Sequence, residues 1–291
     1  MGTKDRVFYQ KNEITCKGKK IHLSTPKIMG ILNLTPDSFY TKSRQTFKSS
    51  LIACEKMLND GAEFVDVGGY STRPGASEVS TEEEINRTIP VIEAISNEFP
   101  ELAISIDTFR SAVAEIALDA GASMINDISG GELDAEMFNL VASRNVPFVL
   151  THMQGTPQNM QTNPTYSSVA TEVRSSLEQR LCTLKSMGAT NVIVDPGFGF
   201  GKTLDQNYEL LANFDLLRKL GVPLLAGVSR KSMIYKLLDT TAEKALNGTT
   251  TLHTLLLEKG ASILRVHDVK EAAQCITLWS AYSRMDLSKH K

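Results

Sequence analysis

Short apolar runs and longer amphipathic segments alternate along most of the chain. Eight runs rich in β-branched or other apolar residues recur at fairly even intervals, and each is followed by apolar residues at helical spacing. The runs are Lys27–Leu32, Glu63–Val67, Leu102–Ile106, Ala122–Asn126, Val146–Leu150, Asn191–Asp195, Val222–Gly227 and Ser262–Val266. Because each run is nearly continuously apolar, as in a strand that is buried on both faces, the pattern predicts a parallel sheet of βα units.

The segments between the runs carry signals of helix ends. Thr81 followed by Glu84 predicts a capping box at the start of one helix, and Pro90 predicts a kink within it. Gly188 ends the longest predicted helix. One side of that helix is apolar, at Val169, Val173, Leu177, Leu181 and Leu184.

The number of βα units sets the expected fold class. Eight units without a composition break or a Pro/Ser-rich linker favour an α/β fold of the (β/α)8 TIM-barrel type over an open doubly wound sheet, which usually has fewer strands. Val7–Gln10 and Glu13–Cys16, joined by Lys11 and Asn12, predict a hairpin that plugs the N-terminal mouth of the barrel. We therefore expect a hairpin extension over residues 1–25 and a single barrel domain over residues 26–291.

Composition and charge narrow the possible partners. The chain has 291 residues, 42% hydrophobic and 22% charged, and its 31 Lys and Arg against 33 Asp and Glu leave a net charge of −2. The absence of like-charge runs argues against nucleic-acid or anionic-membrane binding. No apolar run approaches the roughly 18 residues of a membrane helix, and the first residues lack the apolar region of a secretory signal. We therefore expect a cytoplasmic protein with small-molecule ligands.

Cysteine and histidine spacing gives no sign of a zinc site. The four cysteines lie far apart in the sequence and are expected to be unpaired thiols, and the five histidines include no H-E-x-x-H arrangement. We expect any catalytic metal to bind oxygen ligands instead.

Polar residues stand at the C-terminal end of every predicted strand. In chain order they are Asn33, Asp66, Asp107, Asn126 with Asp127, His152, Asp195, Ser229–Lys231, and Arg265 with His267. The loops after the strands form the active face of a parallel barrel. Each Asp or Asn could instead serve only to cap the next helix. Polar groups at all eight ends together predict a ligand site.

Asp195 indicates what kind of ligand this site accepts. It ends an apolar run and is followed by Pro196 and Gly197, which do not continue a helix from a capping Asp. A buried carboxylate must be paired, and a heterocycle with two parallel N–H donors would satisfy it. Asn126 can both donate and accept hydrogen bonds in the same plane. These residue types fit a 2-amino-4-oxo-pyrimidine ring.

Positive charge gathers at the ends of the last two predicted strands. Lys231, Arg265 and His267 lie where barrels commonly bind phosphate, and Asp268 begins a helix whose N-terminal amides add to the field. Lys231 could instead be a solvated first-turn residue, whereas Arg265 within an apolar run requires an anion. We expect this corner to bind an anionic substrate group.

The glycine-rich segment 196–203 resembles a Walker A loop but lacks its first glycine, which is Pro196 here. Phe198 and Phe200 within it could stack on a flat ligand or belong to the core. The polar segments 33–38 and 71–75 could close over a substrate or be plain surface loops.

These motifs resemble those of the dihydropteroate synthases. The matching segments are Met29–Phe39, Asp66–Ala76, Ser105–Arg110, Asn126–Gly131, Asp195–Lys202, Ser229–Ser232 and Arg265–Val269. The resemblance implies a TIM-barrel transferase of the monofunctional bacterial type, usually a homodimer. It implies that the enzyme joins p-aminobenzoate to 6-hydroxymethyl-7,8-dihydropterin diphosphate and releases pyrophosphate in folate biosynthesis.

The resemblance also implies roles for individual residues. It implies that the pterin diphosphate contacts Thr72, Asp107, Asn126, Asp195, Lys231, Arg265 and His267. It places p-aminobenzoate, and the sulfonamides that mimic it, near Thr72, Arg73, Pro74, Phe200 and Ser232. It makes Asn33 a ligand of Mg2+, and Asp37, Arg73, Asp107 and Lys231 the catalytic residues.

The implied chemistry is a dissociative displacement that electrostatics dominate, because the aromatic amine is already neutral at pH 7 and pyrophosphate is a good leaving group. Two segments depart from the family pattern: Tyr40–Arg44 stands where a Gly-rich stretch is common, and Tyr70 replaces a frequent Glu. These departures leave loop behaviour and sulfonamide sensitivity open.

Two other functions are compatible with parts of the pattern. Corrinoid methyltransferases that use methyltetrahydrofolate have a similar fold and a similar ring-binding pattern, but they need no diphosphate pocket, so Lys231, Arg265 and His267 favour the synthase. A paralogue that binds pterin without turnover is the second alternative. Asp37, Arg73, Ser232 and Arg265 argue against it.

Overall fold

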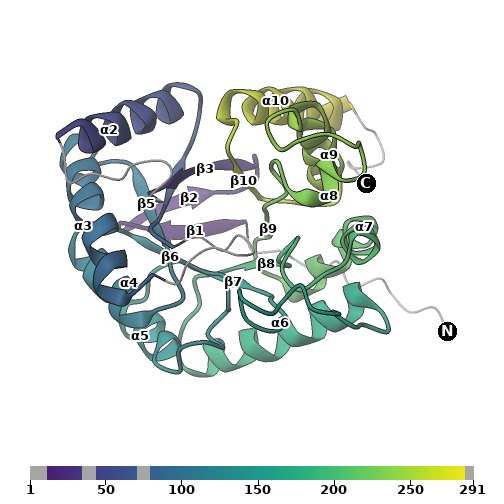
Figure 1. The fold of residues 1–291 in the computed structure, drawn as a ribbon, viewed down its shortest axis with the longest axis horizontal. Helices are drawn as coiled ribbons and strands as arrows, with labels where there is room; N and C mark the ends of the chain where they lie inside the picture. The colour runs from purple at the N-terminus through teal and green to yellow at the C-terminus, as the bar shows by residue number, and fades with distance from the viewer. Residues whose placement is uncertain (1–11, 35–43, 71–78, 286–291) are drawn as a thin grey trace.

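Parallel strands form the centre of the molecule, and helices surround them in the computed structural model (Figure 1). The structure describes residues 12–34, 44–70 and 79–285. Within these ranges every predicted strand is found, in a sheet of eight. The predicted (β/α)8 TIM barrel is confirmed.

The strands follow one another around the barrel in the order β8-β7-β6-β5-β4-β3-β10-β9. Their bounds are β3 Lys27–Asn33, β4 Phe64–Gly68, β5 Ala103–Asp107, β6 Met124–Asp127, β7 Phe148–Thr151, β8 Val192–Asp195, β9 Leu225–Ala226 and β10 Ile263–Val266. The two ends of this order, β8 and β9, also meet. Val194 of β8 forms a parallel bridge with Leu224, the residue before β9, and the Val194 N–H donates to the Pro223 carbonyl at 2.9 Å. The sheet is therefore closed rather than open and doubly wound.

Helices follow the strands in the way that the sequence pattern predicts. Their bounds are α2 Arg44–Asn59, α3 Thr81–Glu98, α4 Ser111–Asp119, α5 Met137–Arg144, α6 Val169–Ser186, α7 Leu204–Ala212, the 3-10 helix η1 Phe214–Leu220, α8 Ser232–Tyr235, α9 Leu246–Glu258 and α10 Val269–Met285. None of these helices combines the length and the apolar character that a membrane span requires.

The helix α6 shows how its sequence produces its packing. The predicted apolar side, from Val169 to Leu184, is buried against the barrel, because residues three or four apart share one face of a helix. The helix ends at Ser186, and Gly188 then takes a positive φ of 90° that a residue with a side chain rarely adopts.

The start of α3 corrects the predicted capping box. Ser80, not Thr81, is the N-cap, and its hydroxyl accepts from the Glu83 N–H at 3.1 Å. Glu84 is fully buried and pairs with Arg110, because it lies on the inward face of the helix. Pro90 lies inside the helix, which continues to Glu98.

The N-terminal hairpin is present, but Glu13–Cys16 forms its first strand rather than its second. β1 (Glu13–Cys16) pairs in antiparallel fashion with β2 (Lys19–His22), whereas residues 7–10 lie outside the described part of the chain. Lys17 and Gly18 form the turn with positive φ angles of 49° and 72°, as a two-residue hairpin turn requires. The glycine at the second turn position was the signal that the sequence analysis missed.

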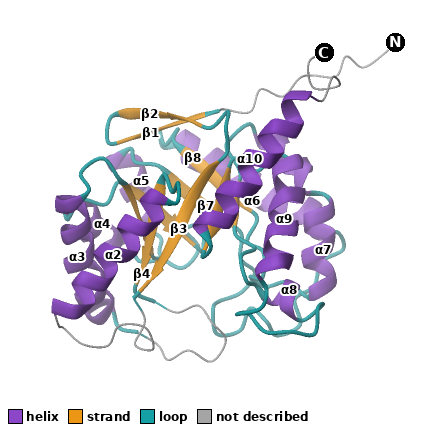
Figure 2. Cartoon of the chain, turned by 90° about the horizontal axis from the view of Figure 1, so that it is seen from above, coloured by secondary structure: helices purple, strands orange, loops and turns teal. Residues whose placement is uncertain are grey.

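This hairpin closes the N-terminal end of the barrel (Figure 2). Ile14, Cys16 and Leu23 are buried against the lowest layer of inward-facing side chains. That layer contains Met29, Phe64, Ala103, Met124, Val149, Ile193, Leu225 and Ile263. The Asn191 side chain accepts from the Thr15 N–H at 3.2 Å and donates to the Thr15 carbonyl at 2.6 Å.

We expect the Ile14→Ala variant to lose about 2–5 kcal/mol of unfolding free energy, because it removes a side chain with 1% exposure from the plug. Urea denaturation would measure the loss. The Lys20→Ala variant is the control, since the Lys20 side chain is 65% exposed, and it should change stability by less than about 0.5 kcal/mol. Equal stability of the two variants would contradict a plug that stabilises the barrel.

Candidate active site

The alternation of side chains along the strands places polar groups inside the barrel, above the apolar layer. Successive residues of a strand face opposite sides, so the second residue after an inward-facing apolar one faces inward as well. Phe64 is followed in this way by Asp66, and Ile263 by Arg265. Asn126 follows Met124, and Asp195 follows Ile193, by the same rule. The polar layer therefore lies at the C-terminal mouth.

Arg265 is the centre of this layer. Its Nε donates to Asp66 Oδ2 and its Nη2 donates to Asp107 Oδ2, both at 2.6 Å. Asn126 Nδ2 donates to the same Asp66 oxygen at 2.9 Å. The anion that a buried arginine requires is thus supplied by the two carboxylates of the protein. The predicted site residues Asp107, Asn126 and Arg265 are brought together, and Asp66 joins them.

Asp107 has a raised pKa. Burial raises the pKa of Asp107 to about 7, the positive charge of Arg265 opposes this shift, and the negative charge of Asp66 adds to it. Asp66 is fully buried, and its Oδ1 has no hydrogen-bond partner in the described part of the chain. The mouth therefore contains acceptor groups in a poorly hydrated environment.

Asp195 lies at the same mouth. Its Oδ1 accepts from the Gly197 N–H at 2.8 Å, and burial raises its pKa. A Cβ placed on Gly227 would lie 3.8 Å from Asp195 Oδ2, 3.9 Å from Arg265 Cβ and 4.0 Å from Lys231 Nζ. The Asp195 carboxylate, the Lys231 ammonium and the base of the Arg265 side chain therefore surround one space, and the absence of a side chain at Gly227 keeps that space open.

Lys231 is not a solvated first-turn residue. It is half-buried, its Nζ donates to the Phe198 carbonyl, and this Nζ lies 4.4 Å from the centroid of the Phe200 ring. Burial lowers its pKa to about 8, although the negative charge of Asp195 opposes the shift. Lys231 thus links the cationic corner to the glycine-rich loop.

The two aromatic residues of the glycine-rich loop have different environments. Phe198 is fully buried and stacks on Phe214 with ring centroids 6.1 Å apart, so it belongs to the core. Phe200 is half-buried beside Lys231, at the mouth. Of the two, Phe200 can meet a flat ligand.

The other predicted residues of the mouth lie around its rim. Ser232 follows Lys231 as the first residue of α8. His267 is exposed, and its Nδ1 lies 3.1 Å from the Ser229 hydroxyl. Asp268 pairs with Arg230 through two hydrogen bonds of 2.8 and 2.7 Å, so the Arg230 guanidinium faces α10.

Asp127 does not take part in the polar layer. Its Oδ1 accepts from the N–H and the hydroxyl of Ser129, each at 2.7 Å, and its Oδ2 accepts from the Gly131 N–H at 2.7 Å. The carboxylate therefore stabilises the turn after β6. Its role is structural, as in the capping alternative, but it bonds to a turn rather than to the end of a helix.

Asn33 ends β3 at the same mouth and offers an oxygen ligand. A Cβ on Gly68 would lie 3.6 Å from Asn33 Oδ1 and 3.7 Å from Asp107 Oδ2, so the two oxygens flank the same glycine. The described ranges hold no cluster of three or more His, Cys, Asp or Glu that could bind a metal. Mg2+ usually takes one or two protein oxygens and completes its shell with water and phosphate, so a single amide oxygen fits this ion.

Four of the predicted site residues lie outside the described part of the chain. They are Asp37, Thr72, Arg73 and Pro74.

Sequence reasoning expected His152 at the mouth but did not predict the buried lysine that lies beside it, Lys202. Lys202 is 3% exposed, and its Nζ donates to the carbonyls of Gly197 and Phe200 at 2.9 Å each. The same Nζ lies 3.1 Å from Nδ1 of His152, which is 6% exposed. The sequence signal for Lys202 is a lysine at the end of a glycine-rich segment that does not match the Walker A pattern.

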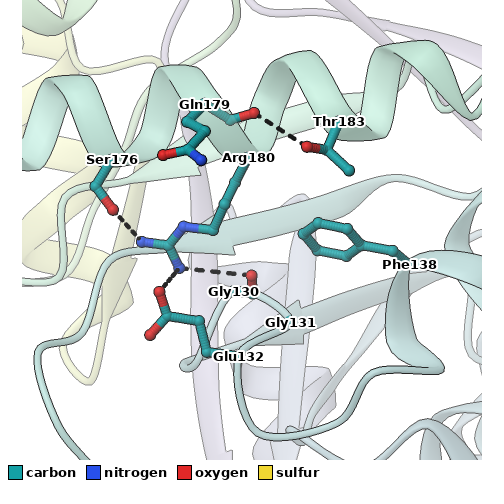
Figure 3. Close-up of a pocket in the computed structure, with 8 residues that line it drawn as sticks. All are labelled: Gly130, Gly131, Glu132, Phe138, Ser176, Gln179, Arg180 and Thr183. Carbon is teal, nitrogen blue, oxygen red and sulfur yellow. Dashed lines mark hydrogen bonds and ion pairs between the residues drawn. The ribbon is translucent and has the colours of Figure 1, made fainter.

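A shallow pocket of about 280 Å³ lies outside the barrel, between α6 and the loop after β6 (Figure 3). Arg180 crosses it and donates to the Ser129 carbonyl at 3.1 Å and to the Ser176 hydroxyl at 2.8 Å. Its nearest carboxylate partner is Glu132, at 3.4 Å. This arginine anchors the loop to the helix, and the pocket contains none of the mouth residues.

Comparisons with known proteins agree along the whole barrel. A family model described as "Pterin binding enzyme" matches residues 29–267, from β3 to the residue after β10. The dihydropteroate synthases of Haemophilus influenzae and Escherichia coli K12 are 41% and 42% identical to this chain, over 92% of it and over 98% and 96% of their own lengths.

Solved structures give the same result. The Yersinia pestis dihydropteroate synthase in a sulfonamide drug complex matches with a TM-score of 0.88 at 38% identity, over 94% of this chain and 99% of that one. The Xanthomonas albilineans dihydropteroate synthase with 4-aminobenzoic acid matches with a TM-score of 0.86 at 38% identity, over 94% and 98%.

We expect the Asp66→Asn variant to lower the pKa of Asp107 from about 7, because the substitution removes a neighbouring negative charge and leaves Arg265 to Asp107 alone. Carboxyl 13C NMR of aspartate-labelled protein would measure the titration. The raised pKa means that the contribution of Asp107 to stability is full below its ordinary pKa of about 3.9 and is lost as the pH rises through about 7. As the pH rises from about 4 to about 7, the Asp66→Asn variant should therefore lose less unfolding free energy than the wild type.

The Asp134→Asn variant is the control, because Asp134 accepts from Ser111 and does not act on Asp107. A pKa of Asp107 that is equal in wild type and Asp66→Asn would show that the two carboxylates do not share the arginine as described.

Proposed function

The chain belongs to the dihydropteroate synthase family of pterin-binding enzymes, and from this premise we propose how its barrel mouth works. The activity is that of a transferase in folate biosynthesis. It joins p-aminobenzoate to 6-hydroxymethyl-7,8-dihydropterin diphosphate, and it releases pyrophosphate and 7,8-dihydropteroate.

One observation carries the proposal: Asp195, Arg265 and Lys231 converge on one space at the mouth. We place the pterin ring in that space. The Asp195 carboxylate would accept from the 2-amino group and a ring N–H, as it would from two donors of an arginine. Asn126 and Asp107 would contact the remaining polar edge of the ring, and Lys231 would donate to a ring acceptor.

The diphosphate would lie towards His267 and the start of α10. His267 is exposed at the rim of the mouth, and the first amides of α10 favour a negative charge there. Arg265 adds positive charge, although its bonds to Asp66 and Asp107 make it a shared rather than a free cation. This arrangement draws electron density towards the leaving pyrophosphate.

The p-aminobenzoate site would begin at Phe200 and Ser232. Both lie beside Lys231, which connects them to the pterin site. The resemblance adds Thr72, Arg73 and Pro74 to this site. The Xanthomonas albilineans relative was solved with 4-aminobenzoic acid and the Yersinia pestis relative with a sulfonamide, which supports both p-aminobenzoate and sulfonamides as ligands here.

The displacement would proceed by loss of pyrophosphate before full bonding to the amine. The buried carboxylates of Asp107 and Asp195 would stabilise the cationic methylene group, while His267, Arg265 and Lys231 stabilise the anion that leaves. The amine of p-aminobenzoate is neutral at pH 7 and needs no strong base. We assign Asp37 and Arg73, from the resemblance, to completing the site around this step.

We propose that Asn33 helps to hold Mg2+ through its side-chain oxygen. A single hard oxygen donor at the mouth suits this ion when substrate phosphates supply further ligands. When bound, the ion would neutralise charge on the diphosphate.

We further propose a single barrel domain that works as a cytoplasmic homodimer. Large apolar side chains are exposed on two neighbouring helices, α9 and α10 (Figure 1). They are Leu255 at 47%, Leu278 at 73%, Tyr282 at 61% and Met285 at 81% exposure. A second copy of the chain would cover these residues, because exposed apolar side chains on neighbouring helices favour an interface between copies.

The two alternative functions differ from the synthase in what they need. A corrinoid methyltransferase needs no cationic diphosphate corner, and the Haemophilus influenzae, Escherichia coli and Yersinia pestis relatives are dihydropteroate synthases. A paralogue without turnover would bind pterin but release no pyrophosphate.

We expect purified protein to release pyrophosphate from the pterin diphosphate when p-aminobenzoate and Mg2+ are present. The Asp195→Asn variant should lose at least about a hundredfold in kcat/KM, roughly 2.7 kcal/mol, because the amide leaves two ring donors mispaired. A coupled pyrophosphate assay would measure both.

The Asp215→Asn variant serves as the matched control, since Asp215 is a surface partner of Lys259. No release by wild type above the no-enzyme background would leave only binding. A loss of less than about fivefold in Asp195→Asn would contradict the placement of the pterin ring.

We expect the wild-type protein to have twice the mass of one chain in size-exclusion chromatography with light scattering, and Leu278→Arg to shift it towards the monomer. A charge at the centre of an apolar interface is costly because it must be desolvated. The Leu133→Arg variant, at a 37% exposed residue of the loop after β6, should stay dimeric. A wild-type monomer, or a dimer that Leu278→Arg leaves intact, would contradict this interface.

A further inference from the structure

Among the residues that the structure describes, the ammonium of Lys202 is an unexpected charge, because it is buried directly behind the mouth. All three of its close partners are neutral acceptors: the Gly197 and Phe200 carbonyls at 2.9 Å and His152 Nδ1 at 3.1 Å. Burying an ammonium without a directly bonded carboxylate is costly, so a structural reason alone would favour an apolar residue.

The loop that Lys202 holds carries contacts of the mouth. The Gly197 N–H donates to Asp195 Oδ1, and the Phe198 carbonyl accepts from Lys231. Phe200 forms the aromatic wall under the Lys231 ammonium. The two carbonyls that accept from Lys202 therefore belong to the residues that orient Asp195 and form this wall.

The other side of this loop packs closely on the segment after β7. A Cβ on Gly197, whose φ is 69°, would collide with the His152 carbonyl oxygen. A Cβ on Gly201, whose φ is 59°, would lie 2.6 Å from the Gln154 carbonyl oxygen. His152 also donates its N–H to the Asp195 carbonyl at 3.0 Å. The loop is thus held between this segment and the Lys202 ammonium.

The charges around Lys202 point to a second role. Asp195 is the carboxylate that acts on it favourably, whereas Lys231 and Arg180 oppose its charge. Three cations favour the ionised form of Asp195: Lys231 before α8, Arg265 on β10 and Lys202 in the glycine-rich loop. Lys202 is also linked to Asp195 through Gly197, because its Nζ donates to the Gly197 carbonyl at 2.9 Å and the Gly197 N–H donates to Asp195 Oδ1 at 2.8 Å.

We propose that Lys202, oriented by His152, is a positioning residue that keeps Asp195 ionised and aimed at the pterin ring and that fixes Phe200 for p-aminobenzoate. The inference rests on the proposed function, because it assigns Asp195 to the pterin and Phe200 to the amine substrate.

The pKa shifts of His152 and Lys202 agree with this geometry. Burial lowers the pKa of His152 to about 2, so the imidazole is neutral and its Nδ1 can accept from the ammonium. Burial lowers the pKa of Lys202 to about 7, and the negative charge of Asp195 opposes this shift. Each partner of the Lys202–Asp195 pair therefore stabilises the charged form of the other.

The test replaces Lys202 by methionine, which is also unbranched, is one heavy atom shorter and carries no charge. Fluorescence titration with 6-hydroxymethylpterin, which carries no diphosphate, would give Kd across a range of pH. Protonation of Asp195 weakens pterin binding, so Kd rises on the acid side. In Lys202→Met we expect the midpoint of that rise to move up by about one pH unit, with Kd about tenfold weaker below it.

Steady-state kinetics provides the second readout. We expect KM for p-aminobenzoate to rise several-fold in Lys202→Met, because Phe200 loses its anchor. Lys202→Arg retains the charge but not the geometry of the ammonium. It should keep the acid-side midpoint of wild type while raising KM for p-aminobenzoate. Lys219→Met, at an exposed lysine of η1, controls for the loss of a positive charge in general.

A folded Lys202→Met variant with wild-type midpoint and wild-type KM would overturn the inference. So would a Lys202→Arg midpoint that moves as far as that of Lys202→Met, because the shift would then not depend on charge. If Lys202→Met fails to fold, His152→Leu/Lys202→Met replaces both buried partners by apolar groups and is held to the same outcomes.

The outcomes separate this inference from the proposed function. Failure of the proposed function would appear as absence of pyrophosphate release by the wild type. Failure of the inference would appear as unchanged titration and KM in variants of a wild type that does release pyrophosphate.

Discussion

Compensation of buried charge is the constraint on which the mouth of this barrel depends. Arg265 lies among apolar strands, and it is tolerable there because Asp66 and Asp107 each accept from it at 2.6 Å. Asn126 completes this network through Asp66. Asp107, which is proposed to contact the pterin, therefore also helps to neutralise the arginine, so binding and stability share this side chain.

The layering of the barrel separates this polar network from the part that stabilises the fold. The twofold period of the strands places an apolar layer, with Phe64 and Ile263, directly below the polar one. The hairpin covers the apolar end through Ile14 and Cys16. One end of the barrel is thus closed and apolar, while the other can remain open and charged without exposing the core.

The glycine-rich loop extends the network beyond the ligand space. Its glycines allow the backbone to approach the segment after β7, and Lys202 supplies a buried positive charge. The charges of Lys231, Arg265 and Lys202 consequently all favour the ionised form of Asp195. In a poorly hydrated site, such fixed charges act more strongly than they would in water.

The sequence by itself determined the barrel and most of its mouth, because strand periodicity and strand-end chemistry are local properties. Asp107, Asn126, Asp195, Lys231 and Arg265 were all expected at the mouth, and the structure places all of them there. Only the tertiary structure decided which charges neutralise one another, because the Arg265–Asp66 pair spans 199 positions along the chain. It also decided that the hairpin turns at Lys17 and Gly18, that Phe198 belongs to the core and that Lys202 is buried. Burial and long-range pairing depend on how distant segments pack, and no local pattern records that.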